Sequence, residues 1–234
     1  MAGWSHAVDL AHAGSLVRVL PDEGGVAVDL VIGGTRPLAR TPWADEVVPA
    51  DVRAPDEPAW VARWRGGWQP CLPSTGHPDS GDPGQSFHGA ASQARWTPVD
   101  RSADQVLLEW ADGSGLVARR RWVLAEHSLG VRGELVNRSS SPRAVAVAEH
   151  LVLGDDLLGG DEVAVDAPAT ATLAPLDYDG RPDGAHVGWP GHPEHRWDRV
   201  GPGTPARVAA LVDVRPRQVT VRAPRTEVAV TWSG

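Results

Sequence analysis

The segment RGGWQPCLPSTG at residues 65–76, followed by QSFHG at residues 85–89, decides how this chain is interpreted. Glycine allows backbone conformations and close approaches that other residues cannot adopt, and proline fixes the turns between them. His88 comes directly before Gly89, so its imidazole is held in a loop of this kind. A histidine in such a position is suited to bind a ligand or to transfer a proton near neutral pH. The two segments therefore predict a loop-borne functional site.

The rest of the chain has the periodicity of β-strands. Short apolar or alternating runs, separated by Gly, Pro, Asp and Ser, lie at residues 15–20, 25–32, 105–111, 115–124, 129–137, 143–153, 207–214, 218–223 and 227–232. No segment of helical length shows a sustained 3.6-residue period, which favours an all-β antiparallel sandwich. We find no composition shift and no internal repeat, so we predict a single domain over residues 1–234. Two long irregular regions, 73–92 and 177–205, are expected to be functional or disordered.

Composition and charge exclude several classes of function. The formal net charge is -8, from 30 acidic residues and 22 basic ones, all of them arginine, and this argues against nucleic-acid binding. Cys71 is the only cysteine, so no intramolecular disulfide is possible. The N-terminus does not resemble a signal peptide, and no apolar run approaches the ~20 residues of a membrane span. We therefore predict a cytoplasmic protein with no membrane partner; the sequence does not indicate its oligomeric state.

A second candidate histidine lies near the end of the predicted strand 143–153. Ala144, Ala146, Ala148 and His150 would share one face of this strand. A face with three alanines packs against bulky partners or leaves a groove, and a histidine at the end of a groove suits a ligand. The alternative is a structural histidine that is hydrogen-bonded within the fold.

The two histidine segments together resemble a known family. The pattern consists of Gly66, Gly67, Pro73 and Gly76, then His88-Gly89, then Trp96, and it is similar to that of the galactose mutarotase-like aldose 1-epimerases. The resemblance covers most of the chain and implies a galactose mutarotase-like β-supersandwich. It also implies a sugar substrate and the exchange of aldose anomers by acid-base ring opening, with no cofactor and no metal.

The resemblance also implies roles for particular residues. His88 and His150 look like the two catalytic histidines that face the sugar; one protonates the ring oxygen and the other orients the sugar. Arg65 is similar to an arginine that contacts the phosphate in the hexose-phosphate branch, a role that suits a guanidinium group. It could equally bond to neutral hydroxyls or lie on an aromatic face. Asp198 is similar to an acidic residue that binds a sugar hydroxyl, and its alternative is an ordinary solvated aspartate.

Tryptophan is unusually frequent, with eleven residues against one tyrosine and one phenylalanine. Most of these indoles are expected to pack in the core. Some are expected to offer a flat face to a sugar ring, and Trp68, inside the first segment, is the candidate we select.

The general base of the family is not found in this sequence. Members carry a base glutamate near the C-terminus, after the strand that residues 227–232 resemble, whereas Glu227 is the last glutamate here and the sequence ends at Gly234. We expect the C-terminal part of the family fold to be missing, and we expect the chain to bind an aldose but to exchange its anomers slowly. The first alternative function is a non-catalytic carbohydrate-binding protein on the same scaffold.

A third possibility is a metal-dependent, cupin-like protein. His186, His192, Glu194 and His195 could bind a metal, although nearby prolines disfavour the helix of an H-E-x-x-H site and the His-x-His pair of cupins is absent. The acidic residues of 177–184 loosely resemble a calcium loop but do not have the EF-hand spacing. Motifs of serine hydrolases and P-loop proteins are absent. Cys71 has no activating neighbour in sequence and is interpreted as a small packed residue.

Overall fold

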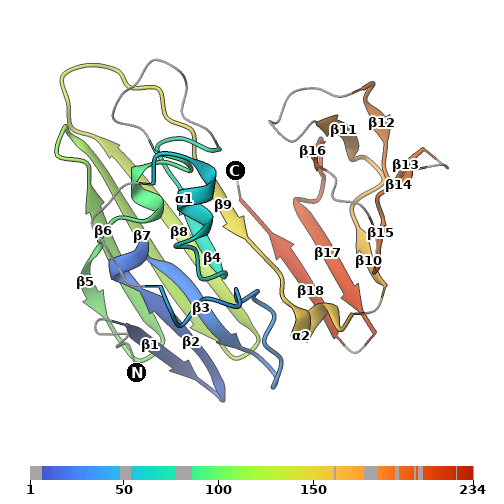
Figure 1. The fold of residues 1–234 in the computed structure, drawn as a ribbon, viewed down its shortest axis with the longest axis horizontal. Coiled ribbons are helices and arrows are strands. Elements are labelled where there is room, and N and C mark those ends of the chain that lie inside the picture. The colour runs from blue at the N-terminus through green and yellow to red at the C-terminus, as the bar shows by residue number, and fades with distance from the viewer. Residues whose placement is uncertain are drawn as a thin grey trace. The chain divides into compact units, whose positions relative to one another are not determined.

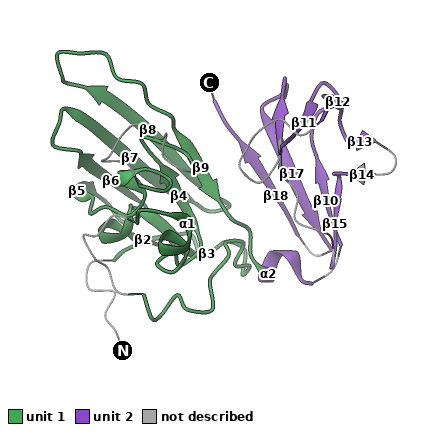
Figure 2. Cartoon of the chain, turned by 45° about the horizontal axis from the view of Figure 1, so that its top comes forward, with its two compact units in different colours: residues 1–154 green, residues 155–234 purple. Residues whose placement is uncertain are grey.

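The computed structural model describes residues 7–47, 54–76, 86–160, 162–176, 184–192, 195–202, 204, 208–224 and 226–233. The chain divides into two compact units, residues 1–154 and residues 155–234 (Figure 2). We describe each unit by itself. The prediction that residues 1–234 form a single domain stays a prediction.

Unit 1 contains two antiparallel sheets. The five-stranded sheet has the order β1 (Val8–His12), β2 (Ser15–Leu20), β3 (Val26–Val31), β4 (Trp68–Cys71), β9 (Ala148–Leu151). The four-stranded sheet has the order β5 (Thr97–Arg101), β6 (Gln105–Ala111), β7 (Leu116–Ala125), β8 (Ser128–Asn137) (Figure 1). One cluster of buried apolar side chains joins residues of both sheets, among them Leu10, Val17, Val19, Val106, Leu108 and Trp122. The core therefore lies between the sheets, and the predicted antiparallel β-sandwich is confirmed.

In the described part of unit 1, three short helices accompany these sheets: η1 (Pro21–Glu23), α1 (Glu57–Val61) and η2 (Ala90–Ser92). The helix α1 begins after Asp56, whose side chain accepts a hydrogen bond of 2.9 Å from the Ala59 amide. This is the usual capping arrangement, and Pro58 in the first turn is compatible with it. The buried residue of this helix, Trp60, contacts Phe87 and His88, which belong to the second of the two quoted segments.

Unit 2 is also antiparallel. It contains α2 (Asp155–Leu158) and a four-stranded sheet with the order β15 (Arg199–Val200), β10 (Val163–Asp166), β17 (Gln218–Ala223), β18 (Thr226–Thr231). A three-stranded sheet has the order β12 (Val187–Gly188), β11 (Thr172–Leu176), β16 (Val208–Val212), and β13 (Gly191–His192) pairs with β14 (His195–Arg196). The four strands β12 to β15 fall in the region 177–205 that was predicted to be irregular, so that prediction is partly wrong.

The predicted strand at 143–153 is corrected by the structure. Only Ala148–Leu151 form a strand, and Ala144 and Ala146 are exposed. The reason lies in the partner strand: β4 ends at Cys71, and the Ala146 amide makes one further bond, of 2.8 Å, to the Pro73 carbonyl. Beyond that point, the described part of the chain offers no strand for residues 143–147 to pair with. The predicted alanine-lined face is therefore reduced to Ala148 and His150.

The double glycine of the first segment is required by packing. Gly66 has φ +95°, and a Cβ there would lie 2.2 Å from the Ala39 carbonyl oxygen; Gly67 has φ +91°, and a Cβ there would lie 2.3 Å from the Ala27 carbonyl oxygen. Both contacts are with backbone, which cannot move aside as a flexible side chain can. These two glycines therefore allow the chain to pass close to two neighbouring segments of unit 1.

This packing predicts unequal costs for alanine at three glycines. Gly66→Ala and Gly67→Ala should each destabilise the protein by about 3 kcal/mol, from backbone strain and overpacking together. Gly76→Ala should cost only about 1 kcal/mol, because Gly76 has φ +70° but open space where the Cβ would lie. Urea denaturation of the three variants measures these differences. Equal losses for all three would contradict the packing argument.

Candidate functional site

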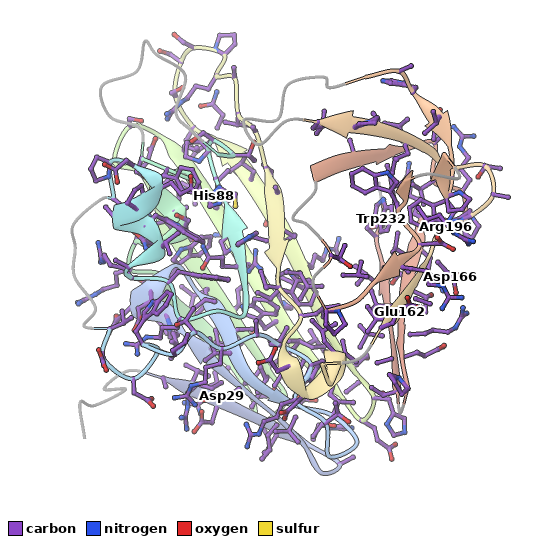
Figure 3. All side chains as sticks on the ribbon, turned by 45° about the vertical axis from the view of Figure 1, so that its right-hand side comes forward. Asp29, His88, Glu162, Asp166, Arg196 and Trp232 are labelled. Atoms are coloured by element: carbon purple, nitrogen blue, oxygen red, sulfur yellow. The ribbon has the colours of Figure 1, made fainter. Side chains whose placement is uncertain are left out.

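The two predicted histidines come together in unit 1. The ring centroids of His88 and His150 are 5.2 Å apart, with an angle of 41° between the rings. His88 lies in the loop before η2, and His150 lies in β9. Figure 3 shows His88 beside α1 and β4. Two residues that are remote in sequence therefore form one cluster.

His88 is held tightly by its loop. Its backbone φ is +58°, its amide donates a hydrogen bond of 2.9 Å to the Gly76 carbonyl, and its carbonyl accepts one of 3.1 Å from the Leu72 amide. The imidazole Nδ1 accepts a bond of 2.9 Å from the Gly76 amide. Because Nδ1 must be unprotonated to accept this bond, the neutral ring carries its proton on Nε2. The histidine is thus fixed in position and in tautomer by one loop.

The glycine after His88 is also explained by the fold. Gly89 has φ +79°, and a Cβ there would lie 2.1 Å from the Leu72 carbonyl oxygen. The His-Gly dipeptide therefore packs against the end of β4. This contact brings the loop, and with it His88, next to the strand that pairs with β9.

His150 lies on a face that α1 and the turn after it cover. Its ring centroid is 5.6 Å from that of Trp60 and 5.4 Å from that of Trp64. Trp60 also contacts His88, at 4.7 Å, and stacks on Trp64, at 5.5 Å. Burial lowers the pKa of His150 below its ordinary value, so the ring is neutral at pH 7. The two histidines are therefore set among aromatic rings, as is common in pockets for organic ligands.

The pairing of β4 with β9 separates two sets of side chains. Gln69 is directly opposite His150, and Trp68 is directly opposite Leu151. Because side chains alternate between the faces of a strand, Gln69 and His150 share one face and Trp68 and Glu149 share the other.

Trp68 lies on the face that contacts the inter-sheet core. Its indole packs edge-on against Trp122, at 5.2 Å between centroids, and donates a bond of 2.7 Å from Nε1 to Glu149. Glu149 also accepts two bonds, of 2.7 and 2.6 Å, from the buried guanidinium of Arg120, which lies 4.4 Å from the Trp122 ring centroid. The structure therefore does not bring Trp68 together with the histidines.

Arg65 is engaged inside unit 1. Its Nε and one terminal nitrogen donate to the two carboxylate oxygens of Glu23, at 2.6 and 2.9 Å. The terminal nitrogens also donate to the carbonyls of Ala44 and Val47. A phosphate would have to displace these bonds to reach the guanidinium. Sequence reasoning missed this because the partner carboxylate comes from a distant part of the chain.

Asp198 lies in unit 2, between β14 and β15. Its carboxylate accepts bonds from the Arg196 guanidinium, at 2.8 and 2.5 Å, and this bonding lowers the pKa of Asp198. Glu227, also in unit 2, accepts a bond of 2.9 Å from Arg222 across the β17–β18 pair. The structure shows both carboxylates in local ion pairs. The sugar-binding roles of Arg65, Trp68 and Asp198 stay predictions.

The residues near the histidines that were not selected from the sequence include Trp60, Trp64, Gln69 and Phe87, whose ring centroid is 4.1 Å from that of His88. The two tryptophans are four residues apart, the spacing at which side chains meet on a helix, so this signal was available. Gln69 carries no such signal. Its place opposite His150 follows only from the register of two strands that are far apart in sequence.

Neither of two cavities in the described part of unit 1 is lined by His88 or His150. One, of about 20 Å³, is lined by Trp64, Gln69 and Gln93 among others, and is about large enough for one water molecule. The second, of about 260 Å³, is lined by Asp29, Arg40 and apolar side chains. Arg65 lines both.

The structure describes only part of each alternative metal site that the sequence suggested. Within the described ranges, no group of three or more His, Cys, Asp or Glu side chains could hold a metal ion. Of the predicted metal cluster, Glu194 and the side chains of His192 and His195 lie outside the described residues, as does most of the predicted calcium loop at 177–184. Burial raises the pKa of Cys71 to about 12, in keeping with a packed thiol. Among the described helices, none is long and apolar enough to cross a membrane.

The lowered pKa of His150 predicts a pH dependence of stability. The unfolded chain binds a proton at His150 near pH 6.5, whereas the folded protein binds it only at lower pH. The free energy of unfolding should therefore fall as the pH is lowered through about 6.5, and this contribution should be absent above it. Urea denaturation at several pH values measures the slope. The variant His150→Gln should have a flatter slope than the parent; identical slopes would contradict the burial argument.

Comparison with known proteins identifies the fold. No protein-family model matches this sequence, and no curated protein is significantly similar to it. A candidate aldose 1-epimerase from Escherichia coli K12 has a similar structure, with TM-score 0.65 and 15% identity, and the match covers 94% of this chain and 74% of that one. A galactose mutarotase-like protein from Lactobacillus casei has TM-score 0.62 and 11% identity, and the match covers 96% of this chain and 78% of that one. A galactose mutarotase related enzyme from Lactobacillus acidophilus has TM-score 0.64 and 12% identity, and the match covers 96% of this chain and 76% of that one. The predicted galactose mutarotase-like fold is confirmed.

Proposed function

We propose that this chain binds an aldose at the site formed by His88 and His150 and promotes the exchange of its anomers. The observation that supports this most strongly is the convergence of the two histidines, with 5.2 Å between ring centroids, on a scaffold that resembles aldose 1-epimerases. The fold alone does not imply a function, so the proposal rests on this site.

The chemistry of anomer exchange fits two imidazole groups. Ring opening requires a proton at the ring oxygen and removal of the proton from the anomeric hydroxyl, which is general acid-base catalysis. His88 carries a hydrogen on Nε2 in its neutral form, because Nδ1 accepts the Gly76 bond. It can therefore donate a hydrogen bond to a sugar oxygen. The imidazolium of His150, whose pKa is lowered, gives up its proton more readily than an ordinary histidine does.

A second function, sugar binding without anomer exchange, is favoured by one observation. Glu149, next to His150 in the chain, is bonded to Arg120 and Trp68 and points to the opposite face of the sheet. This glutamate is therefore not available as the general base for a sugar bound beside the histidines. Without a positioned base, exchange would be slower by roughly 10²–10⁴-fold, while hydroxyl hydrogen bonds and aromatic contacts would remain.

Nuclear magnetic resonance of sugar anomers distinguishes the two functions. Galactose, glucose and their 6-phosphates would be tested with and without protein, with magnetisation exchange between the anomeric signals reporting the rate and ligand-observed saturation transfer reporting binding. Faster exchange supports the first function. Binding with the uncatalysed rate supports the second. Neither binding nor exchange with any of these sugars would overturn both.

A further inference from the structure

Two buried polar atoms belong to directly opposed residues of the β4–β9 pair. Gln69 is 3% exposed, and its Nε2 has no hydrogen-bond partner within the described part of the chain. His150 is its direct cross-strand neighbour, and its Nδ1 is likewise buried without a partner among the described residues. Buried polar atoms are seldom left without a hydrogen bond, so the pair calls for an explanation.

The two atoms are chemically complementary. The carboxamide Nε2 is a donor with two hydrogens, and an unprotonated imidazole Nδ1 is an acceptor. Directly opposed residues of an antiparallel pair have Cβ atoms about 4.5–5.5 Å apart, which lets their side chains meet through a small change of rotamer.

We propose that Gln69 is a positioning residue that sets the tautomer of His150. Its carboxamide donates to Nδ1, so that the neutral imidazole carries its hydrogen on Nε2. The assignment depends on the orientation of the carboxamide, because a reversed amide would present Oε1 and would favour the hydrogen on Nδ1.

The same arrangement is already present at the other histidine. At His88 the Gly76 amide donates to Nδ1 and leaves the hydrogen on Nε2. With Gln69 acting in the same way, both imidazoles have their Nδ1 bonded within the protein and carry their hydrogen on Nε2. The site then selects ligand groups that accept hydrogen bonds, such as ether and hydroxyl oxygens. This last consequence rests on the proposed function; the tautomer of His150 does not.

Histidine nitrogen spectroscopy tests the inference without any sugar. Protein labelled with ¹⁵N-histidine is examined by long-range ¹H–¹⁵N correlation at a pH of about 7.5, above the ordinary histidine pKa. The His150 signals are assigned as those missing from His150→Gln. We expect Nδ1 of His150 to have the shift of an unprotonated nitrogen and Nε2 that of a protonated one, as for His88. A spectrum of the parent protein that places the hydrogen of His150 on Nδ1 would overturn the proposal.

Three variants separate this role from a merely structural one. Gln69→Met keeps the size but removes the donor, so His150 should become a mixture of tautomers. Gln69→Glu offers an acceptor, so the hydrogen of His150 should move to Nδ1. Gln93→Met, in the same small cavity, should leave the tautomer of His150 unchanged. His150 is in ring contact with Trp60, Trp64 and His88. The ¹⁵N signals of His88 serve as the internal reference. An unchanged His150 spectrum in both Gln69 variants would refute the proposal, and the parent spectrum decides even if a variant fails to fold.

Discussion

Replacement of His150 by glutamine is expected to reduce protein-dependent anomer exchange by roughly 10²–10⁴-fold, the usual loss when a positioned proton-transfer group is removed. Glutamine keeps a polar group of similar size but cannot transfer a proton. Sugar binding should weaken much less, by about tenfold or under, since one hydrogen bond contributes about 0.5–1.5 kcal/mol. The measurement is magnetisation exchange between the anomeric signals, alongside saturation transfer to report binding.

The matched control is another histidine of the same unit. His127 lies in the turn between β7 and β8, its side chain is 79% exposed, and His127→Gln should leave exchange unchanged. His88→Gln should lose as much exchange activity as His150→Gln. The double variant should lose little more than either, because the effects of groups that act as one unit are not additive. Full exchange activity in His150→Gln would show that the chemistry lies elsewhere.

The structure brings together the two histidines that the sequence predicted to converge, but in surroundings that the sequence did not predict. The prediction that His88 and His150 converge depends on a resemblance to family motifs. The strand pairing that brings the two residues together is not visible in local periodicity. Gln69 and the pair Trp60 and Trp64 were missed because cross-strand register and a single turn of helix leave weak local signals. The fold class was clear from the sequence, since strand runs such as 105–111 and 218–223 coincide with β6 and β17.

Arg65 shows most clearly where sequence reasoning stops. An arginine beside two glycines has the same appearance in the sequence whether its guanidinium faces a ligand or a carboxylate of the fold. Glu23 is 42 residues away in the chain, and only the tertiary structure shows that it bonds to Arg65 through two hydrogen bonds. Trp68 is a similar case, because the direction of its indole is set by the face of β4 on which it lies.

This ion pair predicts a large loss of stability in Glu23→Ala. The side chains of Arg65 and Glu23 are 6% and 14% exposed, so removal of the carboxylate leaves a buried guanidinium without its countercharge. Breaking such a pair costs about 3–5 kcal/mol. For a chain of this size, that corresponds to a decrease in Tm of roughly 10 °C. Urea denaturation and thermal unfolding at neutral pH measure the change.

Glu227→Ala is the matched control for Glu23→Ala, because it removes the carboxylate of an exposed pair. Arg222 and Glu227 are 54% and 58% exposed, and such pairs contribute about 1 kcal/mol or less. Similar losses for the two variants would mean that Glu23 does not compensate a buried charge. The comparison also tests the predicted phosphate contact of Arg65. If Glu23→Ala keeps its stability and binds a hexose 6-phosphate more tightly than the parent does, the Arg65 guanidinium is available to ligand. If stability falls and phosphate affinity does not rise, Arg65 has a structural role beside the double glycine.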